Sequence, residues 1–229
     1  MVRRFANWQE ICPGNVVQLV RSLDKMRRWP EVALRYFFDV VCPYSYIMGF
    51  EVEEAEDEGL AEIEWLPFEL RPAPAPLPEV RGAYIRGHWR GQVYRLADAH
   101  GVEIHVPRYQ PRSTLALTLH AFAEEAGKGR PFRNAAHHAF FVEGLDLGDD
   151  GVLREVAEEA RLDADAAAEA AWDPARLVAL RATREEALRL GVHGVPTVAT
   201  AEEVLFYGAA QPGRLRAMLA KWPGAGPAV

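Results

Sequence analysis

Cys42 is the residue of this sequence best placed to carry out chemistry. It follows a segment rich in β-forming residues, 32–39, and the proline directly after Cys42, Pro43, is typical of the first turn of a helix. Backbone N–H groups and the positive end of the helix dipole converge at such a position, and both stabilise a thiolate. We therefore expect a Cys42 pKa below that of a free thiol, and a reactive sulfur. The alternative that the residues leave open is an inert buried cysteine.

Ser45 stands three residues after Cys42, where a second cysteine would close a disulfide within the turn. Without that cysteine, the turn cannot exchange two electrons as a dithiol. The Ser45 hydroxyl can instead donate a hydrogen bond to the Cys42 thiolate or to a bound thiolate. The chain's other cysteine, Cys12, could resolve a disulfide only if its Cα came within about 7 Å of the Cα of Cys42, so we expect it to be free.

Two strands and a helix must position Cys42. Residues 32–39 predict a buried strand, a helix begins at Pro43 and ends at Gly59, and a second strand lies within residues 61–70. This β-α-β order requires a parallel strand pair and a crossover helix.

The middle of the chain is expected to be helical. Four alternating prolines in residues 72–78 predict an extended connector, and the clear signals in residues 84–189 are helical. Two short β-like runs follow at residues 197–200 and 204–207, and a last amphipathic helix ends near Trp222. We therefore predict one four-stranded mixed sheet built from both ends of the chain, with the helical block as an insertion.

Two short motifs resemble the DsbA branch of the thioredoxin superfamily. Residues 39–46, Asp-Val-Val-Cys-Pro-Tyr-Ser-Tyr, resemble its active-site turn, and residues 194–197, Gly-Val-Pro-Thr, resemble its cis-proline loop. The segments 141–149 and 208–212 are similar to FrnE-like members of that branch. The resemblance covers residues 32–222 and implies an α/β, thioredoxin-like fold with a large all-helical insertion.

The resemblance also implies roles for particular residues. Cys42 would attack a disulfide as the only cysteine of its motif, and Ser45 would help to hold the charge of the thiolate. Four further residues would bind the substrate or glutathione, namely Pro43, Tyr44, Val195 and Pro196. A thiol–disulfide oxidoreductase that works through one cysteine is the function this implies.

Two other functions stay open. Residues 43–51, Pro-Tyr-Ser-Tyr-Ile-Met-Gly-Phe-Glu, are also similar to kappa-class glutathione transferases and 2-hydroxychromene-2-carboxylate isomerases. In those relatives a serine stands where Cys42 stands here, and it stabilises the thiolate of glutathione. The chain could therefore be a glutathione-dependent isomerase or transferase. The third function is a thioredoxin-like binding module without enzymatic activity.

We expect four parts along the chain. Residues 1–30 hold six basic and two acidic residues and predict an N-terminal amphipathic extension. Residues 31–78 form the first part of the thioredoxin-like domain with the active-site turn, and residues 79–182 form the helical insertion. Residues 183–229 form the second part of the thioredoxin-like domain with the cis-proline loop.

Composition and charge disfavour several classes of protein. The 229 residues are 49% hydrophobic and 26% charged, which suffices to bury a core. The net charge of −7 disfavours nucleic-acid binding, and no apolar run approaches the roughly 20 residues of a membrane-spanning helix. The histidines lack the spacing of metal ligands, so no metal site is expected.

These observations lead to expectations about location and partners. We expect a soluble, cytoplasmic protein with no tightly bound cofactor, for which glutathione could serve as co-substrate. Its partner would be a disulfide-containing protein, or a small thiol or glutathione conjugate. The chain could also form a homodimer.

Overall fold

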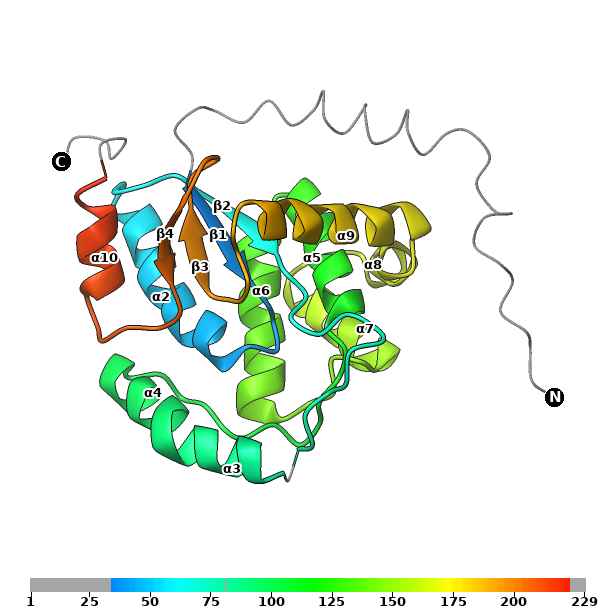
Figure 1. The fold of residues 1–229 in the computed structure, drawn as a ribbon. Helices are drawn as coiled ribbons and strands as arrows, with labels where there is room; N and C mark the ends of the chain where they lie inside the picture. The colour runs from blue at the N-terminus through cyan, green and yellow to red at the C-terminus, as the bar shows by residue number, and fades with distance from the viewer. Residues whose placement is uncertain (1–33, 81, 223–229) are drawn as a thin grey trace. The chain divides into compact units, whose positions relative to one another are not determined.

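A four-stranded mixed sheet lies at the centre of the fold (Figure 1). The strand order is β2-β1-β3-β4; β1 pairs in parallel with β2, and β3 pairs antiparallel with both β1 and β4. The strands are β1 (Leu34–Phe38), β2 (Ile63–Pro67), β3 (Thr197–Ala199) and β4 (Val204–Tyr207). The sheet joins the two ends of the sequence, as predicted, and has the thioredoxin-like arrangement.

The computed structural model describes residues 34–80 and 82–222. All of these residues belong to one compact unit. The predicted amphipathic extension, residues 1–30, and Cys12 lie outside the described residues.

Helix α2 (Pro43–Asp57) is the crossover helix between β1 and β2. It begins at the predicted proline, and Gly59, with φ of +68°, follows its end. The segment between β2 and β3 is helical. Its helices are α3 (Ala83–His88), α4 (Tyr94–His100), α5 (Thr114–Glu125), α6 (Gly129–His138), α7 (Asp150–Glu159), α8 (Ala164–Ala171) and α9 (Pro174–Arg189), with π-helical turns η2 (Trp89–Val93) and η3 (Ala139–Glu143). The last described helix is α10 (Arg214–Leu219).

Aspartates begin the last three helices of the insertion. Asp149, Asp163 and Asp173 each accept a hydrogen bond from a backbone N–H group of the first turn that follows. Helix α9 is continuous through position 182, so the expected end of the insertion falls inside this helix. The four-part division otherwise stays a prediction.

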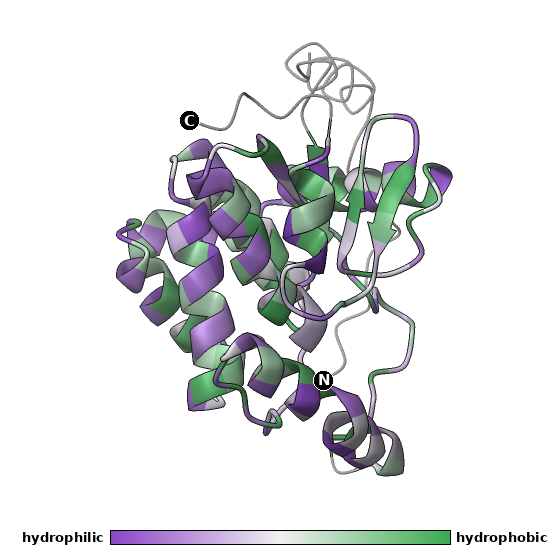
Figure 2. Ribbon diagram, turned by 90° about the vertical axis from the view of Figure 1, so that its left-hand side faces the viewer, coloured by the Kyte–Doolittle hydropathy of each residue, from purple (hydrophilic) through white to green (hydrophobic). Residues whose placement is uncertain are grey.

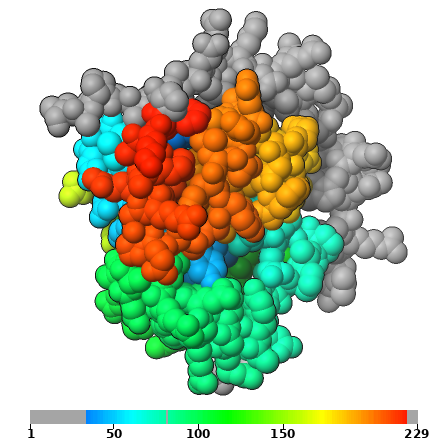
Figure 3. Space-filling view, turned by 60° about the vertical axis from the view of Figure 1, so that its left-hand side comes forward, coloured from blue at the N-terminus to red at the C-terminus, as the bar shows by residue number. Residues whose placement is uncertain are grey.

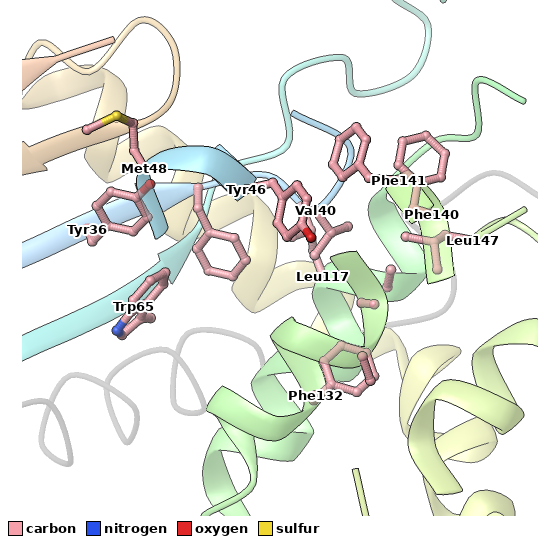
Figure 4. Packing of buried hydrophobic residues seen from close by; sticks show 14 of the residues in the cluster. Tyr36, Val40, Tyr46, Met48, Trp65, Leu117, Phe132, Phe140, Phe141 and Leu147 are labelled. Atoms are coloured by element: carbon pink, nitrogen blue, oxygen red, sulfur yellow. The ribbon is translucent and has the colours of Figure 1, made fainter. Parts of the chain in front are cut away.

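The hydrophobic core runs from the sheet into the helical block. All five residues of β1 are buried. In Figure 2 the strands carry mostly hydrophobic residues, whereas hydrophobic and hydrophilic residues alternate along the helices. In Figure 4, aromatic rings from the sheet, from α2 and from α6 and η3 pack in one cluster. The Tyr46 ring of α2 stacks on Phe141 of η3, with ring centroids 5.3 Å apart. The helical block therefore shares its core with the sheet.

Figure 3 shows a hollow between two parts of the surface that lie far apart in the sequence. One side is formed by α3 and α4, and the other by β4 and the loop that leads to α10. Blue atoms, the colour of the chain near the start of α2, are visible at the bottom of the hollow. The start of α2 is where Cys42 lies.

Candidate functional site

The turn between β1 and α2 holds Cys42 at the start of the helix. Cys42 has extended backbone angles and precedes the first residue of α2, so the predicted position of the sulfur is confirmed. Its N–H donates to the carbonyl oxygen of Asp39 at 3.0 Å, and its own carbonyl oxygen accepts from the N–H of Tyr46 at 3.1 Å. Pro43 occupies the first turn, where no N–H donor is needed.

The second motif, 153 residues further along the chain, faces the Cys42 sulfur. The Sγ of Cys42 lies 3.6 Å from the carbonyl oxygen of Val195, to which the thiol can donate. The Val195–Pro196 peptide bond is cis, as the resemblance implies. The carbonyl of Pro196 accepts from the N–H of Gly208 at 2.8 Å, which attaches this loop to the residue after β4. The structure therefore brings Cys42, Val195 and Pro196 together.

The expectation of a low Cys42 pKa is wrong. Burial raises the pKa of the thiol to about 11, because the sulfur has almost no contact with solvent in which a thiolate could be hydrated. The Ser45 hydroxyl and the N–H groups of Ser45 and Tyr44 lower the pKa, and the nearby Asp39 carboxylate raises it. The helix start thus favours the thiolate as predicted, but burial has the larger effect.

Ser45 is fully buried beneath this turn. Its hydroxyl oxygen accepts from the N–H of Asp39 at 3.3 Å, and its carbonyl oxygen accepts from the hydroxyl of Tyr36 at 3.1 Å. Ser45 therefore fixes the turn from within, in addition to favouring the thiolate of Cys42.

Asp39 is a buried carboxyl group to which the sequence analysis assigned no role. One oxygen accepts from the N–H of Leu70 at 2.8 Å, and the other accepts from the N–H of Val41 at 3.2 Å. Burial raises the pKa of Asp39 to about 6, and the Glu69 carboxylate adds to this effect. A lone carboxylate directly after a predicted buried strand was the signal in the sequence that could have identified it.

Tyr44 connects the active-site turn to the first helices of the insertion. Its hydroxyl donates to the Oε1 of Gln92 at 3.0 Å, and its ring meets the His88 ring edge-on at 5.4 Å. The His88 ring stacks on Tyr84, which is 64% exposed. Burial and the neighbouring Cys42 raise the pKa of Tyr44 to about 12. These aromatic side chains line the approach from α3 to the turn.

Residues 34–80 and 82–222 contain neither a metal-binding cluster nor a membrane-spanning helix. No group of three histidine, cysteine or acidic side chains within them is arranged to hold a metal ion. None of the helices in these ranges is long and apolar enough to cross a membrane.

The thioredoxin-like sheet, the cysteine at the start of α2 and the loop at Pro196 define the class of protein. The chain belongs to the family of the DSBA-like thioredoxin domain, which matches residues 33–220. Its similar proteins include oxidoreductases and an isomerase.

Three of these similar proteins differ in how far their activity is known and in their identity to this chain. Protein YwbO of Bacillus subtilis, itself uncharacterized, is 36% identical over 58% of this chain and 68% of its own. The 2-hydroxychromene-2-carboxylate isomerase of Sphingobium xenophagum is 26% identical over 75% of this chain and 90% of its own. The crystal structure of a probable DsbA oxidoreductase from Streptomyces coelicolor has a TM-score of 0.71 at 23% identity, covering 86% of this chain and 92% of the other.

Proposed function

We propose that this protein is a thiol–disulfide oxidoreductase that works through Cys42 alone. The observation that carries the proposal is the position of Cys42. In a DSBA-like domain, its sulfur lies at the start of α2 and faces the carbonyl of Val195 at 3.6 Å. Ser45 occupies the position of a second cysteine, so the partner thiol must come from outside this motif.

The reaction would consist of two exchanges. The Cys42 thiolate attacks one sulfur of a disulfide, which forms a mixed disulfide and releases the other half as a thiolate that takes up the proton lost by Cys42. A second thiol, for example reduced glutathione, then attacks the mixed disulfide and releases Cys42. One half of the first disulfide leaves as a thiol, and the other half leaves joined to the second thiol in a new disulfide, so the protein itself is neither oxidised nor reduced overall. A compartment that contains glutathione, such as the cytoplasm, would supply the second thiol.

Binding of the substrate would also change the environment of the sulfur. In the described structure the thiol faces the carbonyl of Val195, which favours the protonated form. A substrate whose backbone pairs with Val195 would compete for this carbonyl. The Ser45 hydroxyl and the N–H groups at the start of α2 would then be the groups that stabilise the thiolate.

A second function has support of its own. The relative from Sphingobium xenophagum, similar over 75% of this chain, is an isomerase, and the raised pKa keeps Cys42 protonated near neutral pH. A protonated thiol could donate a hydrogen bond to the sulfur of glutathione rather than form a covalent bond with it. In that case the site would hold glutathione for an isomerisation.

Mass spectrometry of the intact protein after exposure to oxidised glutathione distinguishes the two functions. The oxidoreductase predicts one glutathione adduct, which is absent in Cys42→Ser and retained in Cys12→Ser, and which reduced glutathione removes. Loss of two hydrogens without an adduct would instead indicate that Cys12 and Cys42 form a disulfide.

An unmodified protein that binds reduced glutathione, as measured by calorimetry, would contradict the oxidoreductase and favour the isomerase. Turnover is the second measurement: the protein should accelerate the reduction of a small disulfide by glutathione, and Cys42→Ser should abolish that acceleration.

A further inference from the structure

An open groove of about 530 Å³ lies beside the candidate site, on the hollow side of the molecule in Figure 3. Its volume lies in the range of ligand-binding clefts. Three consecutive residues of β4 line it, together with one residue of α4, three residues of the segment that leads into α10 and the first residue of α10. The lining residues are Leu96, Leu205, Phe206, Tyr207, Ala209, Ala210, Gln211 and Arg214.

The lining shows that this groove follows the edge of the sheet. Side chains along a strand alternate between the two faces, so Leu205, Phe206 and Tyr207 cannot all face the same side of β4. They can line one groove together only where it runs along the strand backbone. Because the sheet order ends with β4, this backbone edge has no neighbouring strand among the described residues.

The hydrogen-bond pattern of the β3–β4 pair identifies which groups face the groove. The N–H of Gly208 donates to the carbonyl of Pro196, and bonded and non-bonded pairs alternate along an antiparallel ladder. Phe206, opposite Val198, therefore points its N–H and C=O toward β3. Tyr207, between these two residues, points its N–H and C=O to the outer edge, where neither has a hydrogen-bond partner within the described part of the chain.

The far wall of the groove is held in place by buried contacts. The Nε2 of His100, at the end of α4, lies 2.9 Å from the carbonyl oxygen of Ala210. The N–H of Gly213 donates to the Glu51 carboxylate of α2 at 2.6 Å. The segment between β4 and α10 is thus attached to two other helices, so the groove exists before any ligand binds.

The groove ends next to the Cys42 site. Tyr207 lies so close to Gly194 that a Cβ on this glycine would be 2.8 Å from the tyrosine hydroxyl oxygen. The next residue, Val195, is the one whose carbonyl faces the Cys42 sulfur. A chain that leaves the groove past Tyr207 therefore arrives at the loop beside the thiol.

The charge of the lining indicates which side chains the groove favours. Arg214 is the only charged residue that lines it, and no ion pair joins Arg214 to another described residue. The other lining side chains are apolar or aromatic, apart from the amide of Gln211. A guanidinium beside apolar walls is complementary to a carboxylate on an otherwise apolar or uncharged ligand.

We propose that this groove binds an extended segment of a polypeptide substrate as a fifth strand on β4, with an acidic side chain of that segment facing Arg214. The exposed N–H and C=O of Tyr207 supply the backbone pairing, and the apolar lining accepts alternate side chains. The identity of the ligand as a substrate rests on the proposed function, whereas the pairing itself does not depend on thiol chemistry.

Amide hydrogen exchange, measured by NMR on the Cys42→Ser variant, tests the pairing without thiol chemistry. The probe is a synthetic heptapeptide of alternating valine and threonine that contains one glutamate. At saturating peptide, the exchange of the Tyr207 amide is expected to slow at least about tenfold, because its N–H gains an acceptor. The Phe206 amide, which already faces β3, is expected to change little.

Matched peptides and one variant separate the contribution of backbone pairing to binding from that of the Arg214 charge. The peptide N-methylated at the residues that face β4 should lose binding, because it cannot donate to the strand edge. Arg214→Gln should weaken binding of the glutamate peptide by about fivefold, as expected for a partly exposed ion pair. The affinity for a peptide in which glutamine replaces that glutamate should stay unchanged.

Three outcomes would overturn the proposal. The first is an unchanged Tyr207 amide at saturating peptide. The second is equal binding of the N-methylated peptide, which would place the ligand elsewhere. The third is protection of Tyr207 that rises with protein concentration in the absence of peptide, which would assign the edge to a second copy of the chain. If the peptide pairs with β4 but Cys42 forms no glutathione adduct, the proposed function fails while the groove remains a peptide site.

Discussion

Two opposing effects at Cys42 decide the state of the sulfur. The start of α2 and the Ser45 hydroxyl favour the thiolate, whereas burial and the Asp39 carboxylate oppose it. The net rise of the pKa to about 11 corresponds to roughly 3 kcal/mol against ionisation, relative to an exposed thiol. The chemistry of this residue therefore depends on how substrate binding changes the groups that shield the sulfur from solvent, among them Val195.

The rate of alkylation of Cys42 should consequently rise steeply with pH. Since only the thiolate reacts, we expect the iodoacetamide rate to increase about tenfold per pH unit from pH 7 to pH 10. Glutathione, measured in parallel, should level off near pH 9. Ser45→Ala should slow the reaction further at each pH, because it removes a group that lowers the thiol pKa. A plateau below pH 8.5 in the wild-type protein would contradict this prediction.

Asp39 should make the stability of the protein depend on pH. Its folded-state pKa, about 6, lies above the ordinary aspartate value, so the protonated carboxyl stabilises the fold. The free energy of unfolding should therefore fall as pH rises from about 4 to 6, by up to about 3 kcal/mol from this residue. Urea denaturation at several pH values between 4 and 6 measures this fall in the free energy of unfolding.

The matched variant for this measurement is Asp39→Asn, which removes the titration and keeps one oxygen acceptor. It should be less stable than the wild type at pH 4, because the N–H groups of Val41 and Leu70 then share that acceptor. Between pH 4 and 6, the free energy of unfolding of Asp39→Asn should fall less than that of the wild type. Parallel curves for the two proteins would show that another group carries the pH dependence.

At the scale of elements, helix boundaries rest on residues that the sequence identifies. Pro43 begins α2, Asp173 caps α9, and Gly191, with φ of +93°, ends α9. Within the block predicted to be helical, the run of alanines in α8 (Ala164–Ala171) shows little contrast between an apolar and a polar face, so apolar spacing does not predict the bounds of this helix. The π-helical turns at η2 and η3 have no local signal that distinguishes them from α-helix.

Two glycine substitutions should have opposite effects on stability. Gly191→Ala places a Cβ on a backbone with positive φ and should lower the free energy of unfolding by about 1 kcal/mol. Gly87→Ala, within α3 and with open space around its Cβ position, should raise it by about 0.5–1 kcal/mol. Urea denaturation of both variants tests the pair. If Gly87→Ala lowered the free energy of unfolding as much as Gly191→Ala, the backbone conformations assigned to these two glycines would be contradicted.

At the scale of the whole molecule, the helical block and the sheet share one core. Arg133 of α6 is buried and lies 3.7 Å from the centre of the Trp65 ring, which belongs to β2. It also pairs with Glu124 of α5 at 2.7 Å and with Glu53 of α2 at 3.4 Å. A buried cation thus connects the insertion to both the sheet and the active-site helix.

Arg133→Ala should therefore destabilise both parts together. Loss of the buried cation leaves the carboxylate of Glu53 short of its buried partner, which is expected to cost about 3–5 kcal/mol. Hydrogen exchange should increase in β1 as well as in α6. The control is Arg154→Ala, which removes the exposed pair with Asp165 and should cost at most about 1 kcal/mol. Faster exchange confined to the helical block would contradict the shared core.

The sequence by itself determined the strands, most of the helices, the two motifs and the family resemblance. These features depend on neighbours along the chain: short β-forming runs, the spacing of apolar residues in helices, prolines and the residue types around Cys42. The tertiary structure decided what surrounds that sulfur, namely the carbonyl of Val195, the Asp39 carboxyl and the exclusion of water. Burial is set by segments up to 153 residues apart, so no local pattern could show that it outweighs the helix start. The same holds for the groove along β4, whose walls come together only in the folded chain.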